Sequence, residues 1–382
     1  MAHPPKQVVV VGGGPGLCDR LRLAGAEITL VDTPDRYESG LVAIARRAIL
    51  GAYDDPALTG QLAAIHEHTP FAAVLSLTEQ GLLPAARIAE ALGIPGLPAE
   101  VVARTRDKLA MRTWLRDKGF SQVACRVVGD AAEIHEFAAA HGYPVIVKPR
   151  QGQGSEDVFC FRTPEAVTAP PEGEFIAEPF LDGPEFSIEA FSRAGEHHVL
   201  AITGKLTAEF VEIGHVVPAP LDPSAAAAVT TYVRDFLEVM GIAEGPSHTE
   251  VRLTAAGPEV IETHTRVGGD SIPTLVRQAT GYDLLDLTAG GPLEPVTPTA
   301  GAAAIRFLTP EPGTVAAIVG VQRASGLPGV LKLHLPLQPG DRVPPVRNSR
   351  TRAGYVLATG PTAAQATERC RRAIAEIRID IR

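Results

Sequence analysis

Two glutamates on neighbouring apolar segments have the residue type and spacing of a metal site. Glu250 lies within residues 247–251 and Glu262 within residues 260–266, and residues 255–258 between them are typical of a turn. The two segments are therefore predicted to form a hairpin that places the carboxylates side by side. Adjacent buried carboxylates repel each other unless a cation neutralises them. Mg²⁺, held by one or two carboxylates plus substrate phosphates, would meet that need.

Arg266 and a short glycine-containing loop follow the second glutamate. A guanidinium at this place is expected to meet a transferred phosphoryl group or an acyl phosphate. Gly268, Gly269 and Asp270 then form a loop that allows close approach to a substrate. The alternative is a surface hairpin with alternating acids. That interpretation does not explain the apolar flanks of both segments or the Arg-Val-Gly-Gly-Asp ending.

Two lysines and a loop have the residue types needed to hold phosphate groups. Lys148 ends an apolar run, from which a compact cation can be directed at phosphate oxygens, and Lys108 lies near the start of an expected helix. In the loop after Lys148, Gly152, Gly154 and Ser155 provide mobility and backbone amides that can close over phosphates. Each feature alone is more typical of a solvated charge or an ordinary turn. Only their combination indicates a nucleotide site.

A further segment has groups suited to the nucleoside. The backbone of Glu178, Pro179, Phe180 and Leu181 follows an expected strand and can hydrogen-bond the edge of a purine, and a carboxylate such as that of Glu185 can bind ribose hydroxyls. A hinge with two exposed acids is the alternative interpretation.

The elements that must position these residues fall into three parts. Residues 7–11, 17–24 and 27–31 predict strand, helix and strand in a parallel, Rossmann-like unit. The middle of the chain predicts a largely antiparallel α+β domain with one long helix at 223–240. The last part predicts short strands and a closing helix at 362–377, a small α+β subdomain. The predicted domain limits are 1–96, 97–298 and 299–382.

The glycine-rich turn after the first strand resembles a dinucleotide fingerprint only in part. Gly12, Gly14 and Gly16 are present, but the pattern from Gly12 requires a glycine where Leu17 stands, and Pro15 has no N–H to donate to a pyrophosphate. A tight strand-to-helix turn is therefore the favoured interpretation. Help from the helix N-terminus in holding a carboxylate substrate is the second.

Composition narrows the class of protein. The net charge of −9 over 382 residues argues against a general nucleic-acid binder. No apolar run approaches the roughly 18 residues of a membrane span. The first residues lack the layout of a signal peptide, so a cytoplasmic protein is expected. The four cysteines form no Cys-x-x-Cys pair, which disfavours a structural zinc site or a disulfide framework.

The order of these segments resembles the ATP-grasp superfamily and, within it, the L-amino-acid-ligase-like carboxylate–amine ligases. The resemblance spans most of the chain, and its strongest features are Val147-Lys148-Pro149, the glycine loop, 178–181 with Glu185, residues 211–215 with Pro218, and the two-glutamate hairpin. It implies that ATP is held by Lys108, Lys148, Lys205, residues 178–181 and Glu185, and that Mg²⁺ is held by Glu250 and Glu262. Lys205 and Arg266 would be the catalytic cations.

One position departs from the family pattern. Members usually have Asn two residues after the second glutamate, whereas this chain has His264. Imidazole could be a third metal ligand but prefers softer ions, so a hydrogen bond to a phosphate or to a metal-bound water is an equal alternative. The resemblance also draws a set of residues towards the substrate pocket: Glu79, Glu212, His215, His248, Arg266, Gly268, Gly269 and Asp270. For His215 and His248 a structural role is the alternative.

The resemblance implies ligation of a small-molecule carboxylate to an amine, with ATP activating the carboxylate as an acyl phosphate. Amino acids are the expected substrates, and a homodimer is among the expected assemblies. A carboxylase of the same superfamily that activates bicarbonate is one alternative. A non-catalytic nucleotide-binding module is another.

Overall fold

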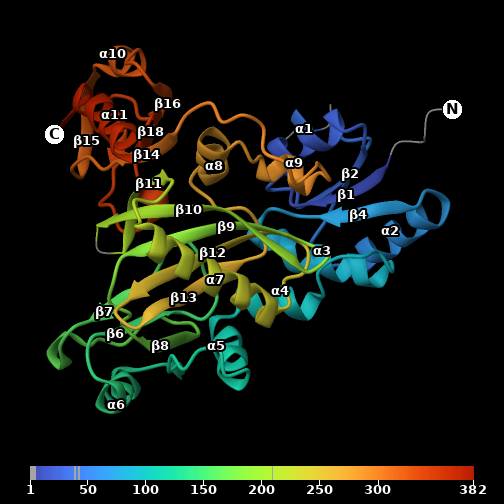
Figure 1. The fold of residues 1–382 in the computed structure, drawn as a ribbon, viewed down its shortest axis with the longest axis horizontal. Helices are drawn as coiled ribbons and strands as arrows, with labels where there is room; N and C mark the ends of the chain where they lie inside the picture. The colour runs from blue at the N-terminus through green and yellow to red at the C-terminus, as the bar shows by residue number, and fades with distance from the viewer. Residues whose placement is uncertain (1–5, 38–39, 42–43, 209) are drawn as a thin grey trace.

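The structure, a computed structural model, describes residues 6–37, 40–41, 44–208 and 210–382. The N-terminal residues on which the signal-peptide expectation depends lie in part outside this range. Figure 1 shows three parts: an N-terminal domain, a large central region and a C-terminal part that packs on the far end of the central sheet. No helix within the described ranges is both long and apolar enough to cross a membrane.

The N-terminal domain is a parallel sheet, as predicted. Its strand order is β3 (Arg47–Leu50), β2 (Glu27–Asp32), β1 (Gln7–Val11) and β4 (Phe71–Leu75). The helices are α1 (Pro15–Leu23), α2 (Pro56–His68) and α3 (Glu79–Ala91). Buried Val9 and Val11 on one face of β1, and Val8 and Val10 on the other, pack into two separate cores. A sheet covered on both faces explains the unbroken apolar run of this strand.

The predicted glycine turn is tight and crowded. Gly12 has φ 83°, and a Cβ added to it would collide with the side chain of Thr78. A Cβ on Gly13 would lie 3.0 Å from an Asp32 carboxylate oxygen. These glycines are therefore required by the close approach of neighbouring strand ends, which supports the interpretation as a structural turn.

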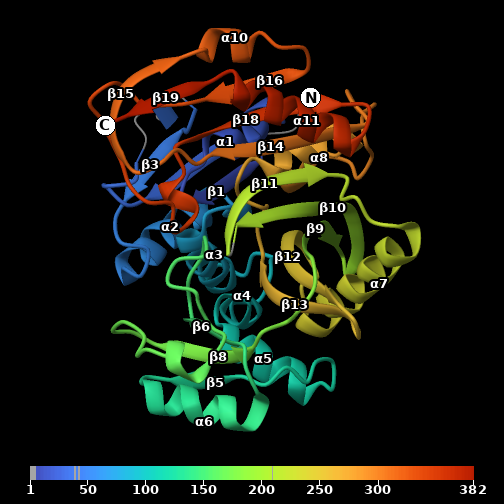
Figure 2. The same ribbon diagram turned by 90° about the vertical axis from the view of Figure 1, so that its left-hand side faces the viewer.

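A small four-stranded sheet forms the lower part of the central region (Figure 2). Its order is β5 (Arg126–Val128), β8 (Phe175–Pro179), β6 (Val145–Pro149) and β7 (Phe159–Phe161), all antiparallel. Helix α6 (Ala131–His141) covers one face through Ile134 and Phe137. Helices α4 (Ala99–Arg106) and α5 (Lys108–Asp117) connect this sheet to the N-terminal domain.

The large sheet has eight strands and carries most of the site. Its order is β13 (Gly257–His264), β12 (Gly245–Thr254), β9 (Glu185–Arg193), β10 (Glu196–Ala208), β11 (Val211–Val217), β14 (Ala302–Leu308), β18 (Gly354–Gly360) and β16 (Val330–His334). Helix α7 (Pro223–Met240) packs on it through Val233, Phe236 and Met240, all fully buried. Every strand pair in this sheet is antiparallel, as expected for the middle of the chain.

The C-terminal part shares this sheet. Strands β14, β18 and β16 extend it beyond β11, which the sequence analysis did not predict. Separately, β15 (Gly313–Val319), β17 (Arg342–Val343) and β19 (Arg378–Ile381) form a three-stranded sheet. The remaining helices of this half of the chain are α8 (Ile272–Thr280), α9 (Leu284–Thr288), α10 (Val321–Ser325) and α11 (Ala363–Ala375). The predicted domain limits stay a prediction.

Candidate active site

The two glutamates lie directly opposite each other on a hairpin, as the sequence predicted. Glu250 on β12 and Glu262 on β13 are register partners in this antiparallel pair. Their side chains are only 13% and 17% exposed. Two carboxylates held this close in a partly desolvated place need positive charge nearby.

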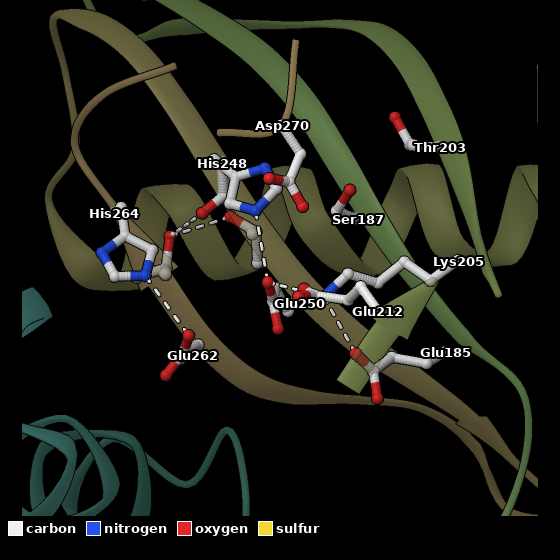
Figure 3. Close-up of polar contacts among 12 residues, drawn as sticks. Glu185, Ser187, Thr203, Lys205, Glu212, His248, Glu250, Glu262, His264 and Asp270 are labelled. Carbon is white, nitrogen blue, oxygen red and sulfur yellow. Dashed lines mark hydrogen bonds and ion pairs between the residues drawn. The ribbon is translucent and has the colours of Figure 1, made fainter. Parts of the chain in front are cut away.

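Lys205 supplies that charge to Glu250. Its Nζ lies 2.6 Å from Glu250, 2.9 Å from Glu185 and 3.1 Å from Glu212, and its side chain is 1% exposed (Figure 3). Burial alone would raise the pKa of Glu250, but Lys205 and His248 outweigh it and hold that pKa at about 2. One buried cation therefore contacts three acids and favours the ionised form of Glu250.

Lys108 does the same for Glu262 from the other side. Its Nζ lies 2.9 Å from Glu262 Oε2 and donates to the carbonyl oxygen of Gly152 in the glycine loop. Burial opposes ionisation of Glu262, yet Lys108 and His264 lower its pKa well below the usual range. Lys108 thus joins the predicted metal pair to the predicted phosphate loop.

The donor set fits Mg²⁺. Glu250 and Glu262 present ionised carboxylate oxygens, the hard ligands that this ion prefers, with lysines poised to balance phosphate charge. No group of three His, Cys, Asp or Glu side chains within the described ranges is arranged to hold a metal. A bound Mg²⁺ would then take its other ligands from phosphate and water. His264 therefore does not complete a three-ligand group with Glu250 and Glu262. Its role as a metal ligand stays a prediction.

The two nitrogens of His264 face carboxylates. Nε2 lies 3.3 Å from Glu262 and Nδ1 lies 3.1 Å from Glu79 (Figure 3 shows the first contact). Glu79 is the first residue of α3 and also accepts from Arg266 Nε at 3.0 Å and from Arg106 at 3.2 Å. Burial alone would raise the pKa of Glu79, but His264 and Arg266 hold it at about 2. The N-terminal domain therefore contributes an anion to the end of the metal hairpin.

A buried ion-pair group forms the base of the predicted nucleotide pocket. Glu178 on β8 contacts Lys148 Nζ at 2.7 Å and Arg112 Nε at 2.8 Å, and its side chain is 5% exposed. Burial opposes ionisation, but the two cations lower the pKa of Glu178 to about 2. Arg112 was not predicted from the sequence. Its signal was a lone arginine on the apolar face of an amphipathic helix, beside Met111 and Leu115.

The structure brings most of the predicted nucleotide-binding residues around one cavity between the small sheet and the β12–β13 hairpin. These are Lys108, Lys148, Gly152, Ser155, Glu178, Pro179, Phe180, Leu181 and Glu185. Glu185 is bound there by Lys205 and by Arg252 Nη2 at 2.9 Å. Gly154 and Lys205 line the neighbouring cleft instead.

That neighbouring cleft collects most of the predicted substrate residues. It is lined by Glu212, His215, His248, Arg266, Gly269 and Asp270, and Glu250 and Glu262 line both cavities. The glutamate pair therefore stands at the junction of the nucleotide pocket and the cleft. Glu79 and Gly268 do not line the cleft directly; each contacts a residue that does.

A residue from the C-terminal part fixes Asp270. Arg352 donates through Nη1 and Nη2 to the two Asp270 oxygens at 2.7 and 2.6 Å, and its guanidinium lies over the Phe307 ring. His215 Nε2 lies 3.1 Å from Asp270. Burial alone would raise the pKa of Asp270, but His215 and Arg352 outweigh it and depress it. Arg352 was not predicted, because only the shared sheet brings residue 352 to this loop.

A second buried pair supports Glu250. His248 lies 2.9 Å from Glu189 through Nδ1 and 3.3 Å from Glu250 through Nε2. Glu189 is fully buried and accepts from Ser187 and Thr203 as well. Burial alone would lower the pKa of His248, but the carboxylates raise it to about 9. An imidazolium thus bridges a buried acid and the predicted metal ligand, and Glu189 is a further residue that the sequence analysis missed.

The C-terminal part also touches the glycine loop. The amide of Ser349 donates to the Gly154 carbonyl at 3.2 Å, and Arg350 lies 3.2 Å from Glu156. Ser349 Oγ in addition donates to Glu212 at 2.7 Å. One short segment therefore contacts both the phosphate loop and the cleft.

Comparison with known families agrees with this architecture. Residues 21–96 match the ATP-grasp N-terminal domain, residues 162–274 the ATP-grasp domain, and residues 306–382 the L-amino acid ligase C-terminal domain 2. Proteins of this superfamily use ATP, typically with Mg²⁺.

Individual relatives are distant. The chain is 25% identical over 296 residues to the L-arginine-specific L-amino acid ligase of Bacillus subtilis, covering 72% of this chain and 71% of that protein. It is 25% identical over 276 residues to the dapdiamide A synthase of Enterobacter agglomerans, covering 63% and 64%. The crystal structure of an L-amino acid ligase from Bacillus licheniformis superimposes with a TM-score of 0.83 over 100% of both chains at 24% identity, which establishes the shared fold. The chain is an ATP-grasp protein similar to the L-amino acid ligases, with an N-terminal parallel-sheet domain, a central ATP-grasp domain and an L-amino acid ligase C-terminal domain.

Proposed function

We propose that this chain joins the carboxylate of one amino-acid substrate to the amine of another, consuming ATP and releasing ADP and phosphate. The observation that carries the proposal is the position of Glu250 and Glu262, which line both the nucleotide pocket and the polar cleft. A phosphoryl group leaving a nucleotide in the first cavity would arrive at a carboxylate held in the second.

The proposed reaction has two steps. A substrate carboxylate oxygen attacks the γ-phosphorus of ATP, the bond to ADP breaks, and an acyl phosphate forms. The amine nitrogen then attacks the acyl carbon, a C–N bond forms, phosphate leaves, and the nitrogen loses a proton. Positioning and charge neutralisation are the main contributions of a protein to such transfers.

Different side chains would provide the positioning and the charge neutralisation. Glu250 and Glu262 would hold Mg²⁺, which when bound neutralises phosphate charge. Lys148, Lys205 and Arg266 would bind phosphate oxygens, and the glycine loop would close over them to exclude water. Two of these cations are paired with acids in the structure: Lys148 with Glu178 and Arg266 with Glu79. Glu178 to Leu181 would bind the base and Glu185 the ribose.

The cleft has charges of both signs, which suits zwitterionic substrates. Arg266 offers a cation for a carboxylate, while Glu212 and Asp270 offer anions for an ammonium group. A cytoplasmic location and a homodimer remain part of the proposal.

The test is ATP-dependent phosphate release and amide formation with a panel of amino-acid pairs. Glu262→Gln keeps the size of the side chain but removes a carboxylate charge, so near-complete loss of ADP release is expected. Glu368→Gln, on the exposed face of α11, is the matched control and should act like the parent. Normal ADP release by Glu262→Gln would contradict the proposal.

Two alternatives are separated by the same assay. A carboxylase would release ADP with bicarbonate and without an amine. A non-catalytic nucleotide-binding module would bind ATP but release no ADP with any substrate pair.

A further inference from the structure

A separate cavity of about 450 Å³ lies where the N-terminal domain meets the central region. Strand β4, helix α3, the end of β9 and helix α9 meet around it (Figure 1). None of its lining residues lines the nucleotide pocket or the substrate cleft. Its volume is in the range of natural small-molecule sites.

The lining is mainly apolar. Leu82 and Ala86 on α3, Phe191 on β9 and Leu287 on α9 provide side chains from both sides of the junction. Such a surface accommodates an apolar body. A ligand that is polar over its whole surface, such as a sugar, would lose hydration there without gaining hydrogen bonds.

One buried hydroxyl in the lining has no partner. Thr265 is 5% exposed, and its Oγ1 has no hydrogen bond within the described chain. An unsatisfied buried hydroxyl is unfavourable. The oxygen itself has almost no accessible surface, so Thr265 forms part of the cavity wall.

One cation in the lining has no ion-pair partner. Arg193 donates through Nη2 to the carbonyl oxygen of Gly291 at 2.9 Å and lies beside the Phe191 ring, and it contacts no carboxylate within the described chain. A guanidinium has five N–H donors, so most of those on Arg193 remain free for a carboxylate.

The cavity also touches the supports of the active site. Helix α3 lines it with Leu82 and Ala86 and begins at Glu79, which holds His264 and Arg266. Thr265 stands between those two residues in the chain. A ligand packed against α3 and Thr265 would therefore change the positions of Glu79, His264 and Arg266 relative to one another.

We propose that this cavity is an effector site for a small carboxylate with an apolar body. The carboxylate pairs with Arg193, and the apolar body fills the space between α3 and α9. This inference concerns binding alone and does not depend on which amide the enzyme makes.

The test uses octanoate as the probe and calorimetric titration of the full chain. One octanoate per chain is expected, and octan-1-ol, which lacks the charge, should bind at least tenfold more weakly. Arg193→Gln should weaken octanoate binding at least tenfold, and Ala86→Phe, which fills the cavity, should abolish it. Octanoate should also change the Kd of Mg-ADP at least threefold in the parent chain, since linked sites affect each other reciprocally.

Absence of octanoate binding, or equal binding to the parent and to Arg193→Gln, would overturn the site. Unchanged Mg-ADP affinity at saturating octanoate would overturn the effector role. If Ala86→Phe does not fold by circular dichroism, Arg193→Gln and the comparison with octan-1-ol decide the matter. Failure of the amide assay would leave these titrations interpretable, because they require no turnover.

Discussion

Gly268 lies against His248 and Glu189, the buried pair that supports Glu250. A Cβ at this position would lie 2.8 Å from His248 Nδ1 and 3.1 Å from Glu189 Oε2, closer than those fixed atoms allow. Gly268→Ala is therefore expected to lower the free energy of unfolding by about 1–3 kcal/mol, the usual cost of forcing a group into a packed site. Urea unfolding followed by circular dichroism measures the change.

The adjacent glycine provides the control. A Cβ added to Gly269 would meet no atom within 4 Å. Gly269→Ala should therefore unfold at nearly the same urea concentration as the parent. Equal destabilisation by both substitutions would mean that the loop, rather than the His248–Glu189 pair, responds to the added methyl group.

Glu178 provides a prediction about pH. Its pKa is held at about 2 in the folded protein against an ordinary value of 4.5. Because the folded pKa is the lower one, ionised Glu178 stabilises the fold above about pH 4.5, and this contribution is lost as the pH falls towards 2. The difference in unfolding free energy between the parent and Glu178→Gln should thus be greatest near neutral pH and shrink below pH 4.5. Exposed Glu172→Gln is the control, and a pH-independent difference for Glu178→Gln would contradict the prediction.

At the scale of single residues, the sequence was sufficient where both the side-chain chemistry and the local spacing indicated a function. The facing of Glu250 and Glu262 followed from two strands and a short turn, and the register confirms it. Glu189 and Arg112 were missed because their importance depends on strand and helix neighbours far away in the chain. A glutamate inside an apolar strand, as Glu189 is, was the available signal.

At the scale of elements, α7 holds the sheet that carries the glutamate pair. Phe236 is fully buried in the core that also contains Val251, next to Glu250, and Val260, two residues before Glu262. Phe236→Ala should lower the free energy of unfolding by about 3–5 kcal/mol. Thr231→Ala, on the exposed side of the same helix, is the control and should cost little. A loss below 1 kcal/mol for Phe236→Ala, measured by urea unfolding, would contradict this account.

Helices with clear ends were predicted best. Helix α7 has the predicted bounds, because Asp222 caps its first turn and Gly241 follows its last residue. Strand β3 and helix α2 were not predicted. Two of the four β3 side chains are exposed and the other two only partly buried, so the strand gives no strong apolar pattern. Short elements at the edge of a sheet depend more on their neighbours than on their own pattern.

At the scale of the whole molecule, Arg352 ties the C-terminal part to the cleft. Arg352→Lys keeps the charge but loses the two-pronged hydrogen bonding to Asp270. We expect kcat/KM for the amino-acid substrates to fall at least tenfold while the KM for ATP changes little. Arg347→Lys, at an exposed position, is the control. An equal rise in both KM values would instead indicate a general loosening of the fold.

The way in which the three parts join could not be predicted from the sequence. Their order and type were predicted, but the pairing of β11 with β14, which extends the central sheet into the C-terminal part, is a contact between segments about ninety residues apart. No local pattern specifies such a partner. Arg352 follows from that pairing and was missed with it.

The contacts of Ser349 and Arg350 with the glycine loop have a consequence for timing. Because the same segment contacts Gly154, Glu156 and Glu212, a movement of the loop away from the nucleotide pocket would break these contacts or carry a wall of the cleft with it. In the second case the two cavities would open together. In the proposed reaction, an acyl phosphate formed between the two cavities would meet water only when both ends open, and ADP, phosphate and the amide would leave together.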